Sequence, residues 1–73
     1  MFLKNRVEEL RRARGWTTQT ELSKQTKLVD PDGKGISQAT ISDIEKFHIT
    51  VKGRNLKLLM LVFGVTHDEI VIY

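Results

Sequence analysis

The sequence contains no cysteine, and this absence sets the first limits on its chemistry. Without thiols the chain has no disulfide, no thiolate zinc site and no cysteine nucleophile, which is ordinary for the reducing cytoplasm. No apolar run approaches the roughly 18 residues of a membrane span, and the charged side chains between Lys4 and Glu9 interrupt any signal-peptide core. We therefore expect a soluble, cytoplasmic protein with no membrane partner.

Length and charge narrow the class further. With 73 residues, residues 1–73 are expected to form a single domain with one modest core and no deep catalytic cleft, so no enzymatic activity is expected. Residues 1–27 hold seven Lys/Arg and three Glu, a balance of +4, and residues 28–73 hold five basic and six acidic side chains, a balance of −1, which together give the net charge of +3. The basic first part suits an anionic partner, although small basic domains are common.

Apolar periodicity predicts helices along most of the chain. Apolar side chains at positions 3, 7 and 10 recur at helical spacing and predict a first helix that ends near residue 15. In "TQTE" (18–21), Thr18 can accept a hydrogen bond from the N–H of Glu21 while the glutamate reaches back. This capping box predicts a second helix from Thr18 to about Lys27 that buries Leu22 and Ser23.

A loop is expected at 27–36, because "DPDGKG" (30–35) places Pro31 and Gly33 at the second and fourth positions of a type I turn. Ser37 can cap a third helix over 37–46 that turns Ile41 and Ile44 inward. The helix predicted in "RNLKLLMLVFG" (54–64) is apolar on more than one side. Its main face would consist of Leu56, Leu59, Met60 and Phe63. With a short fifth helix after the second capping box "THDE" (66–69), the expected fold class is an all-α bundle of five helices.

The third helix has an unusual outer face. In "SQATISDIEK" (37–46) the side opposite the isoleucines carries only Gln38, Ala39, Ser42 and Asp43, where a solvated face would more often carry long Glu, Lys and Arg. Short side chains let a helix approach another surface closely. A second helix, a connection and a third helix with a compact polar face are typical of a helix-turn-helix reader of the DNA major groove.

The sequence also resembles the phage Cro/repressor-like (XRE-type) helix-turn-helix family. The resemblance rests on "LRRARGWTTQTELSKQT", on "ISQATISDIEK" and on "NLKLLMLVFGVTHDEI", which stand in the family's order and cover nearly the whole chain. It implies a lambda-repressor-like five-helix bundle whose loop between helices 2 and 3 is enlarged. The connection over 27–36 is longer than usual, Lys27 replaces the glycine that closes helix 2, and an extra threonine, Thr17 or Thr18, lies in the first turn.

Residue by residue, the resemblance implies that Gln38, Ala39, Ser42 and Asp43 contact bases. Elementary base recognition agrees, since glutamine pairs with adenine, an alanine methyl contacts the thymine methyl and aspartate accepts from cytosine. No Arg or Lys is among these residues, which predicts A·T-leaning recognition with modest affinity per subunit. The alternative is that all four are simply solvated polar or small residues.

Phosphate contacts are expected from a second group of residues. The resemblance places a phosphate at the start of the second helix, where free N–H groups carry partial positive charge. The expected phosphate contacts are Thr18, Gln19, Lys34, Thr40, Lys46, His48, Lys52 and Arg54. For the charged members, simple solvation is an equal alternative, and Lys34 would reach the DNA backbone or a partner subunit only if the loop projects from the body.

The family further places a helix 1 arginine against a helix 3 glutamate, which here are Arg11 and Glu45. The alternative is that they are two unrelated surface charges. Reading a palindrome would require a two-fold homodimer. Its interface would use the surplus apolar side chains of Leu58, Leu61 and Val62 and the "IVIY" terminus, unless these complete the core.

Metal binding and catalysis find little support in the sequence. Asp30, Asp32 and Gly35 match three positions of a calcium loop, but Lys34 and Ile41 stand where carboxylates are required. A second conceivable set of metal ligands or catalytic residues consists of Ser42, Asp43, Glu45 and His48. No second histidine lies near this set in the sequence, and no group polarises the serine.

The sequence therefore predicts a transcriptional regulator that recognises operator DNA, most simply a repressor without cofactor, in the nucleoid. Two alternatives remain open. One is an antitoxin that uses the same fold to bind DNA and a toxin, or a regulator with another protein partner such as an antirepressor. The other is a protein-interaction module that does not bind DNA.

Overall fold

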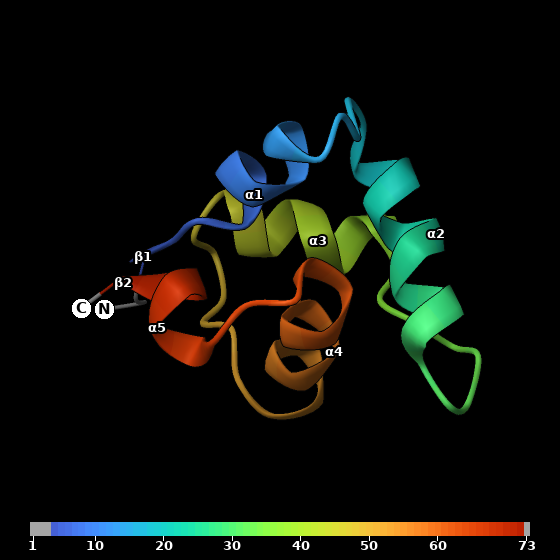
Figure 1. Ribbon diagram of the computed structural model, residues 1–73. Coiled ribbons are helices and arrows are strands. Elements are labelled where there is room, and N and C mark those ends of the chain that lie inside the picture. The colour runs from blue at the N-terminus through green and yellow to red at the C-terminus, as the bar shows by residue number, and fades with distance from the viewer. Residues whose placement is uncertain (1–3, 73) are drawn as a thin grey trace.

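The computed structural model describes residues 4–72, which form five helices and one short two-stranded sheet (Figure 1). In chain order the elements are β1 (Lys4–Asn5), α1 (Val7–Ala13), α2 (Gln19–Val29), α3 (Gln38–Glu45), α4 (Gly53–Phe63), α5 (His67–Ile70) and β2 (Val71–Ile72). Figure 1 shows α3 at the centre, with α1, α2 and α4 around it. The five predicted helices are confirmed. The two-stranded sheet was not predicted, because the expected fold was purely helical.

The two strands join the ends of the described chain. They run antiparallel, with Lys4 opposite Ile72 and Asn5 opposite Val71. Because residues 4–5 are extended, α1 begins only at Val7, and the apolar position 3 of the predicted helix lies outside the described residues. The side-chain oxygen of Asn5 accepts a hydrogen bond from the N–H of Val7 at 3.1 Å, which satisfies one of the free donors at the start of α1.

The second helix begins where its cap predicts and ends later than predicted. The Thr18 hydroxyl accepts from the N–H of Glu21 at 3.2 Å. The helix continues to Val29, so Lys27 lies within it and does not close it. The connection to α3 is therefore residues 30–37, which corrects the predicted loop of 27–36. The buried side chains of α2 are Leu22, Ser23 and Thr26.

The carboxylate of Asp30 fixes the base of this loop. It accepts from the backbone N–H groups of Asp32, Lys34 and Gly35 at 3.0, 3.1 and 2.8 Å. Arg54, from α4, forms an ion pair with the same carboxylate and donates to the carbonyl of Gly35 at 3.0 Å. The predicted turn is present, since the N–H of Gly33 donates to the Asp30 carbonyl at 2.9 Å.

The end of the loop is part of the core. The N–H of Ile36 donates to the Thr26 hydroxyl at 2.9 Å, and its carbonyl accepts from the Ser23 hydroxyl at 2.6 Å. Gly35 has a φ of +62°, and a Cβ there would lie 2.5 Å from Cγ of Lys27, so the close approach of loop and helix requires glycine. Ile36 is 2% exposed. Within the loop, residues 31–34 at its tip and the cap residue Ser37 are exposed.

The core lies between α3 and the elements around it. Its fully buried side chains are Val7, Leu22, Ile41, Ile44, Leu59, Phe63 and Ile70. Trp16 stacks on Phe63 with ring centroids 5.9 Å apart and covers one end of this core.

The fourth helix buries a face that matches the predicted one in part. Leu59 and Phe63 are buried as predicted, but Leu58 joins them, and Leu56 and Met60 are only partly buried. Gly64, with a φ of +65°, ends the helix. At the following turn the predicted capping box is wrong, because Thr66 makes no side-chain cap bond.

We expect Asp30→Asn to lower the thermal unfolding midpoint at neutral pH, because the amide replaces an acceptor of three N–H groups and ends the ion pair with Arg54. Hydrogen bonds from the backbone of Asp32 and Gly35, together with Arg54, hold the pKa of the Asp30 carboxyl below its usual value. Because the pKa of Asp30 is lower in the folded protein than in the unfolded chain, the ionised carboxylate stabilises the fold above the unfolded pKa of about 4. This stabilisation is lost as the pH falls through the pKa of the folded protein. The difference in midpoint between wild type and variant should therefore shrink below about pH 4.

Circular dichroism melts across this pH range measure the effect. The control is Asp32→Asn, on the same loop, whose side chain is exposed. Equal midpoints for wild type and Asp30→Asn at neutral pH would contradict the role of the Asp30 carboxylate.

Candidate nucleic-acid interface

The outward side of α3 carries the four predicted base-contacting residues. Gln38, Ala39 and Asp43 are exposed, and Ser42 is half-buried. Ile41, Ile44 and Glu45 are the buried side chains of the helix. The loop over 30–37 therefore does not cover the exposed side, which forms a strip of small and polar groups.

The first turn of this helix is capped as predicted. The Ser37 hydroxyl accepts from the N–H of Thr40 at 3.2 Å and donates to the Thr40 hydroxyl at 2.9 Å. Thr40 is half-buried. With Ser37 as N-cap and Lys46 as C-cap, the helix matches the predicted range of 37–46.

A buried ion pair connects α1 to α3. Nε of Arg11 lies 2.8 Å from Oε2 of Glu45, and a second guanidinium nitrogen, Nη2, donates to Oε1 at 3.3 Å. The two side chains are only 4% and 2% exposed. The predicted pair is confirmed, and its two parallel contacts fix the distance and the angle between the helices.

This pair makes two further hydrogen bonds. Nη1 of Arg11 donates to the carbonyl of Trp16 at 2.9 Å, and Oε1 of Glu45 accepts from Nε2 of Gln19 at 3.0 Å. No buried side-chain nitrogen or oxygen within residues 4–72 lacks a partner. A buried charge is costly unless it is paired and hydrogen-bonded, and here both conditions are met.

Two further hydrogen bonds hold the ends of α3. Near its start, Nε2 of Gln38 donates to Oε1 of Gln19 at 2.7 Å, which links the first turns of α2 and α3. Near its end, the buried amide of Asn5 donates to the carbonyl of Ile44 at 2.9 Å. Helix α3 is therefore attached at three points, to α1, α2 and β1.

Beyond the end of α3 lie the exposed side chain of Phe47 and the imidazole of His48, which is close to the carboxylate of Asp43 on α3. Phe47 adopts a φ of +62°, a conformation usual for glycine at the end of a helix, and its side chain is 39% exposed. Nδ1 of His48 lies 3.5 Å from Oδ1 of Asp43, and both side chains are more than half exposed. A protonated His48 can therefore offset the negative charge of Asp43.

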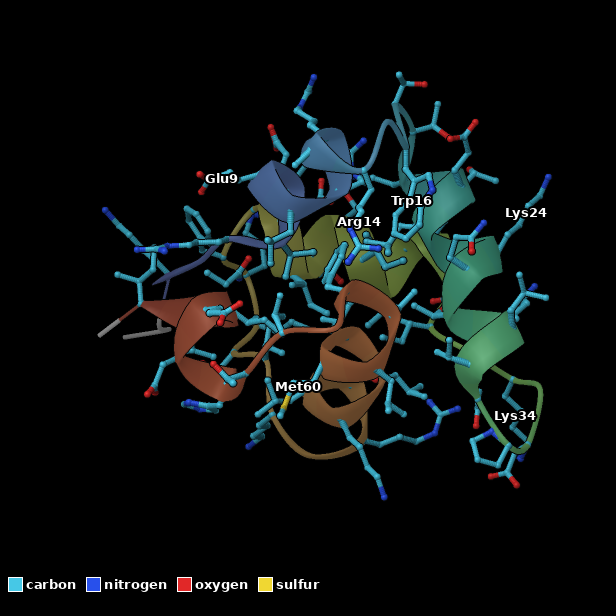
Figure 2. All side chains as sticks on the ribbon, viewed as in Figure 1. Glu9, Arg14, Trp16, Lys24, Lys34 and Met60 are labelled. Carbon is cyan, nitrogen blue, oxygen red and sulfur yellow. The ribbon has the colours of Figure 1, made fainter. Side chains whose placement is uncertain are left out.

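The predicted phosphate contacts do not all lie in one place. Lys46, His48 and Lys52 are exposed. Arg54 instead holds the loop, through Asp30 and the Gly35 carbonyl. Figure 2 shows Lys34 on the loop beyond the last turn of α2. Thr18 and Gln19 lie at the opposite end of that helix, which is about 16 Å long.

The structural roles of three polar residues were not anticipated from the sequence, although Gln19 was expected to contact a phosphate. Asn5 attaches β1 to α3, Gln19 bridges Glu45 and Gln38, and Asp30 organises the loop. Only the role of Asp30 could have been predicted from the sequence, because an aspartate before Pro-Asp-Gly commonly accepts a hydrogen bond from the backbone N–H two residues later. The bonds of Asn5 and Gln19 depend on contacts between distant segments, which periodicity does not reveal.

Two negative observations concern the described residues alone. Across residues 4–72 no three His, Asp or Glu side chains lie together so as to hold a metal ion. In the same range no helix has the length and apolar character needed to cross a bilayer.

Comparisons with models of protein families, with curated proteins and with solved structures found no match to this chain.

We expect Arg11→Met to lower the free energy of unfolding by about 3–5 kcal/mol, because it leaves the Glu45 carboxylate buried without a counter-charge. Arg12→Met is the matched control, since Arg12 pairs with Glu8 at 3.4 Å on the surface with side chains 66% and 52% exposed. Exposed pairs of this kind contribute about 0–1 kcal/mol. Urea unfolding monitored by tryptophan fluorescence measures both variants, and similar losses in the two would contradict the structural role of the Arg11–Glu45 pair.

Proposed function

We propose that this chain is a lambda-repressor-like helix-turn-helix protein that binds duplex DNA with α3 in the major groove and represses transcription by occupying an operator. The observation that carries the proposal is the exposed strip of Gln38, Ala39 and Asp43 on a helix that a buried ion pair holds in place. The resemblance of its motifs to the Cro/repressor-like family supports the same function.

The groups on the strip suit base edges. The Gln38 amide can donate to and accept from adenine, the Ala39 methyl can contact a thymine methyl, and Asp43 can accept from cytosine N4. The strip has no arginine or lysine, which are the commonest partners of guanine. Recognition would therefore favour A·T pairs, with Ser42 available for either type of pair.

The DNA backbone would be held by groups beside the strip. The first turn of α2, with Thr18 and Gln19, offers N–H groups to a phosphate. Lys46, His48 and Lys52 follow α3 and are exposed. We leave Lys34 and Arg54 out of this surface, because one lies at the far end of α2 and the other is bound to Asp30.

Such contacts should make binding strongly dependent on salt. A dimer touching about six phosphates would show a log–log slope of binding constant against salt near −5. Lys46→Ala should make the slope less steep by about one for each phosphate contact removed. Lys34→Ala, a change of the same type at the opposite end of α2, should leave it unchanged.

Fluorescence anisotropy with a duplex recovered from a random pool measures these slopes. A binding constant for the wild type that does not respond to salt would contradict the proposal. It would favour a protein-interaction module instead.

A homodimer would let the protein read two half-sites, and we place its interface at the end of the molecule that carries the strands. Phe47 and Ile72 are exposed there beside a hollow that also includes Arg6, Glu8 and Arg12, so the same surface offers apolar groups and both signs of charge to a second copy. The longest dimension of the fold is 30 Å. Figure 1 shows the strands and α2 on opposite sides of the molecule, with α3 between them. Two copies joined end to end would therefore hold their α3 helices about one DNA turn, roughly 34 Å, apart.

Most of the apolar residues considered for this role from the sequence are not available for it. Leu58, Ile70 and Val71 belong to the core, and Val62 is partly buried against it. Leu61 is 54% exposed and lies beside the loop, near Pro31. Tyr73 lies outside the described residues.

We expect Ile72→Glu to shift the protein from dimer to monomer and to weaken binding to a palindromic duplex more than to a single half-site. Sedimentation velocity and anisotropy on the two duplexes measure this. Leu28→Glu is the control, because Leu28 is 77% exposed at the end of α2. A dimer that survives Ile72→Glu but not Leu28→Glu would place the interface at the opposite end.

The exposed Leu61 favours one second candidate, in which a protein such as a toxin or an antirepressor binds the hollow that the loop and α4 line. This surface is separate from the α3 strip. DNA binding and a protein partner are therefore compatible in one molecule.

A further inference from the structure

We propose that His48 takes up a proton when this protein binds DNA, and that the resulting imidazolium joins the carboxylate of Asp43 to a DNA phosphate. The affinity for DNA should then fall as the pH rises from about 6 to about 8, where histidine side chains change charge. The inference rests on the proposed function. It adds a dependence on pH, which phosphate contacts made by lysine or arginine do not have in this range.

The backbone at the end of α3 places His48 beside Asp43. The N–H of Phe47 donates to the carbonyl of Ile44 at 3.1 Å, and the N–H of His48 donates to the carbonyl of Asp43 at 2.9 Å. With the positive φ of Phe47, these two bonds form the Schellman motif, which turns the chain back over the last turn of a helix. Nδ1 of His48 then lies 3.5 Å from Oδ1 of Asp43. The position of the imidazole next to the exposed strip is therefore a consequence of how the helix ends.

The pair is open to solvent, with side chains 63% and 52% exposed. Within residues 4–72, Asp43 is the only ion-pair partner of His48. Charged side chains on the surrounding elements are Lys46, Lys52 and, across the hollow beside Phe47, Arg6, Glu8, Glu9 and Arg12. Lysine, arginine and glutamate side chains each keep one charge between about pH 6 and pH 8, so among these groups the imidazole alone changes charge there.

A bridge between two anions requires both N–H groups of the imidazolium. A neutral imidazole has one N–H, and its other ring nitrogen is an acceptor. Both the Asp43 carboxylate and a phosphate oxygen are acceptors, so a neutral His48 can donate to only one of them. The imidazolium can donate from Nδ1 to Asp43 and from Nε2 to the phosphate, and two anions beside one ring favour its charged form.

The phosphate is the partner that makes the proton uptake worthwhile. An exposed acid–base pair contributes little by itself. A carboxylate on a strip that enters the groove would also repel the phosphates on either side. The proton that His48 takes from solvent offsets this charge at the moment of binding, so Asp43 can remain on the strip as an acceptor for cytosine N4.

The binding constant should therefore depend on pH at constant ionic strength. With the duplex recovered from a random pool, its logarithm should fall with pH at a slope no steeper than about −1 per subunit, the limit for one proton. The total loss between about pH 6 and pH 8 should be roughly tenfold per subunit, the order of one charge-assisted contact. Fluorescence anisotropy at several pH values measures both quantities.

Two substitutions fix the charge at position 48. His48→Lys keeps a cation across the range, so binding should remain strong at the high end and lose its dependence on pH. His48→Gln can donate hydrogen bonds but carries no charge, so binding at the low end should be as weak as that of the wild type at the high end. Because the His48 side chain is exposed, circular dichroism should show the same fold for both variants.

The matched control is His67→Gln, the same change at the second of the two histidines. His67 lies 3.3 Å from Asp68 in a similar acid–base pair on α5, and it is not part of the proposed DNA surface. This variant should keep the pH dependence of the wild type. Asp43→Asn removes one of the two anions and should lessen that dependence.

The protons taken up can also be counted directly. Isothermal titration calorimetry in two buffers that differ in their ionisation enthalpy gives the number of protons bound with the duplex. Near pH 7 the wild type and His67→Gln should take up a measurable fraction of a proton per subunit, about one at most. His48→Lys and His48→Gln should lack this uptake.

The outcomes separate the two proposals. If the wild type binds no duplex at any pH of the range, the proposed function fails and this inference fails with it. If the wild type binds a selected site but His48→Gln and His67→Gln show the same pH dependence and proton uptake, the function stands and the inference is wrong. Loss of both with His48→Gln and His48→Lys, but not with His67→Gln, supports it.

Discussion

The ion pair between Arg11 and Glu45 is the constraint on which the rest of the site depends. It is almost completely buried, and it makes two further hydrogen bonds, from Arg11 to the Trp16 carbonyl and from the Gln19 amide to Glu45. A buried pair of this kind adds little net stability compared with apolar side chains of similar size, because desolvation offsets most of the attraction. Its contribution is geometric, since it admits only one placement of α3 against α1 and α2.

Much of the helical architecture follows from local sequence, but its boundaries do not. The period of apolar residues and the caps at Thr18 and Ser37 locate α2 and α3 correctly. Helix α2 runs past its predicted end because the carboxylate of Asp30 organises the turn only after Val29. Strands of two residues have no periodicity of their own, so the pairing of residues 4–5 with 71–72 was beyond local reasoning.

The site was predictable in its residue types and less so in its connections. The short outer face of α3 could be read directly from the order of its residues. The Arg11–Glu45 pair came from the family resemblance, since nothing local joins residues 34 positions apart. The bonds from Gln19 to Gln38 and from Asn5 to Ile44 span 19 and 39 positions, and they exist only because the core brings those segments together. For the same reason Arg54, counted from sequence among the phosphate contacts, holds the loop instead.

The closed base of the loop also has a bearing on how this chain can vary. Because Asp30 and Ile36 fix both ends, the spacing between α2 and α3 does not depend on how many residues form the exposed tip. Lengthening a flexible surface segment costs little, about 0.6 kcal/mol for each doubling. The tip, remote from Gln19 and Gln38, is therefore a natural place to accept an inserted peptide, such as an epitope or a fluorophore acceptor sequence, without disturbing the helix pair.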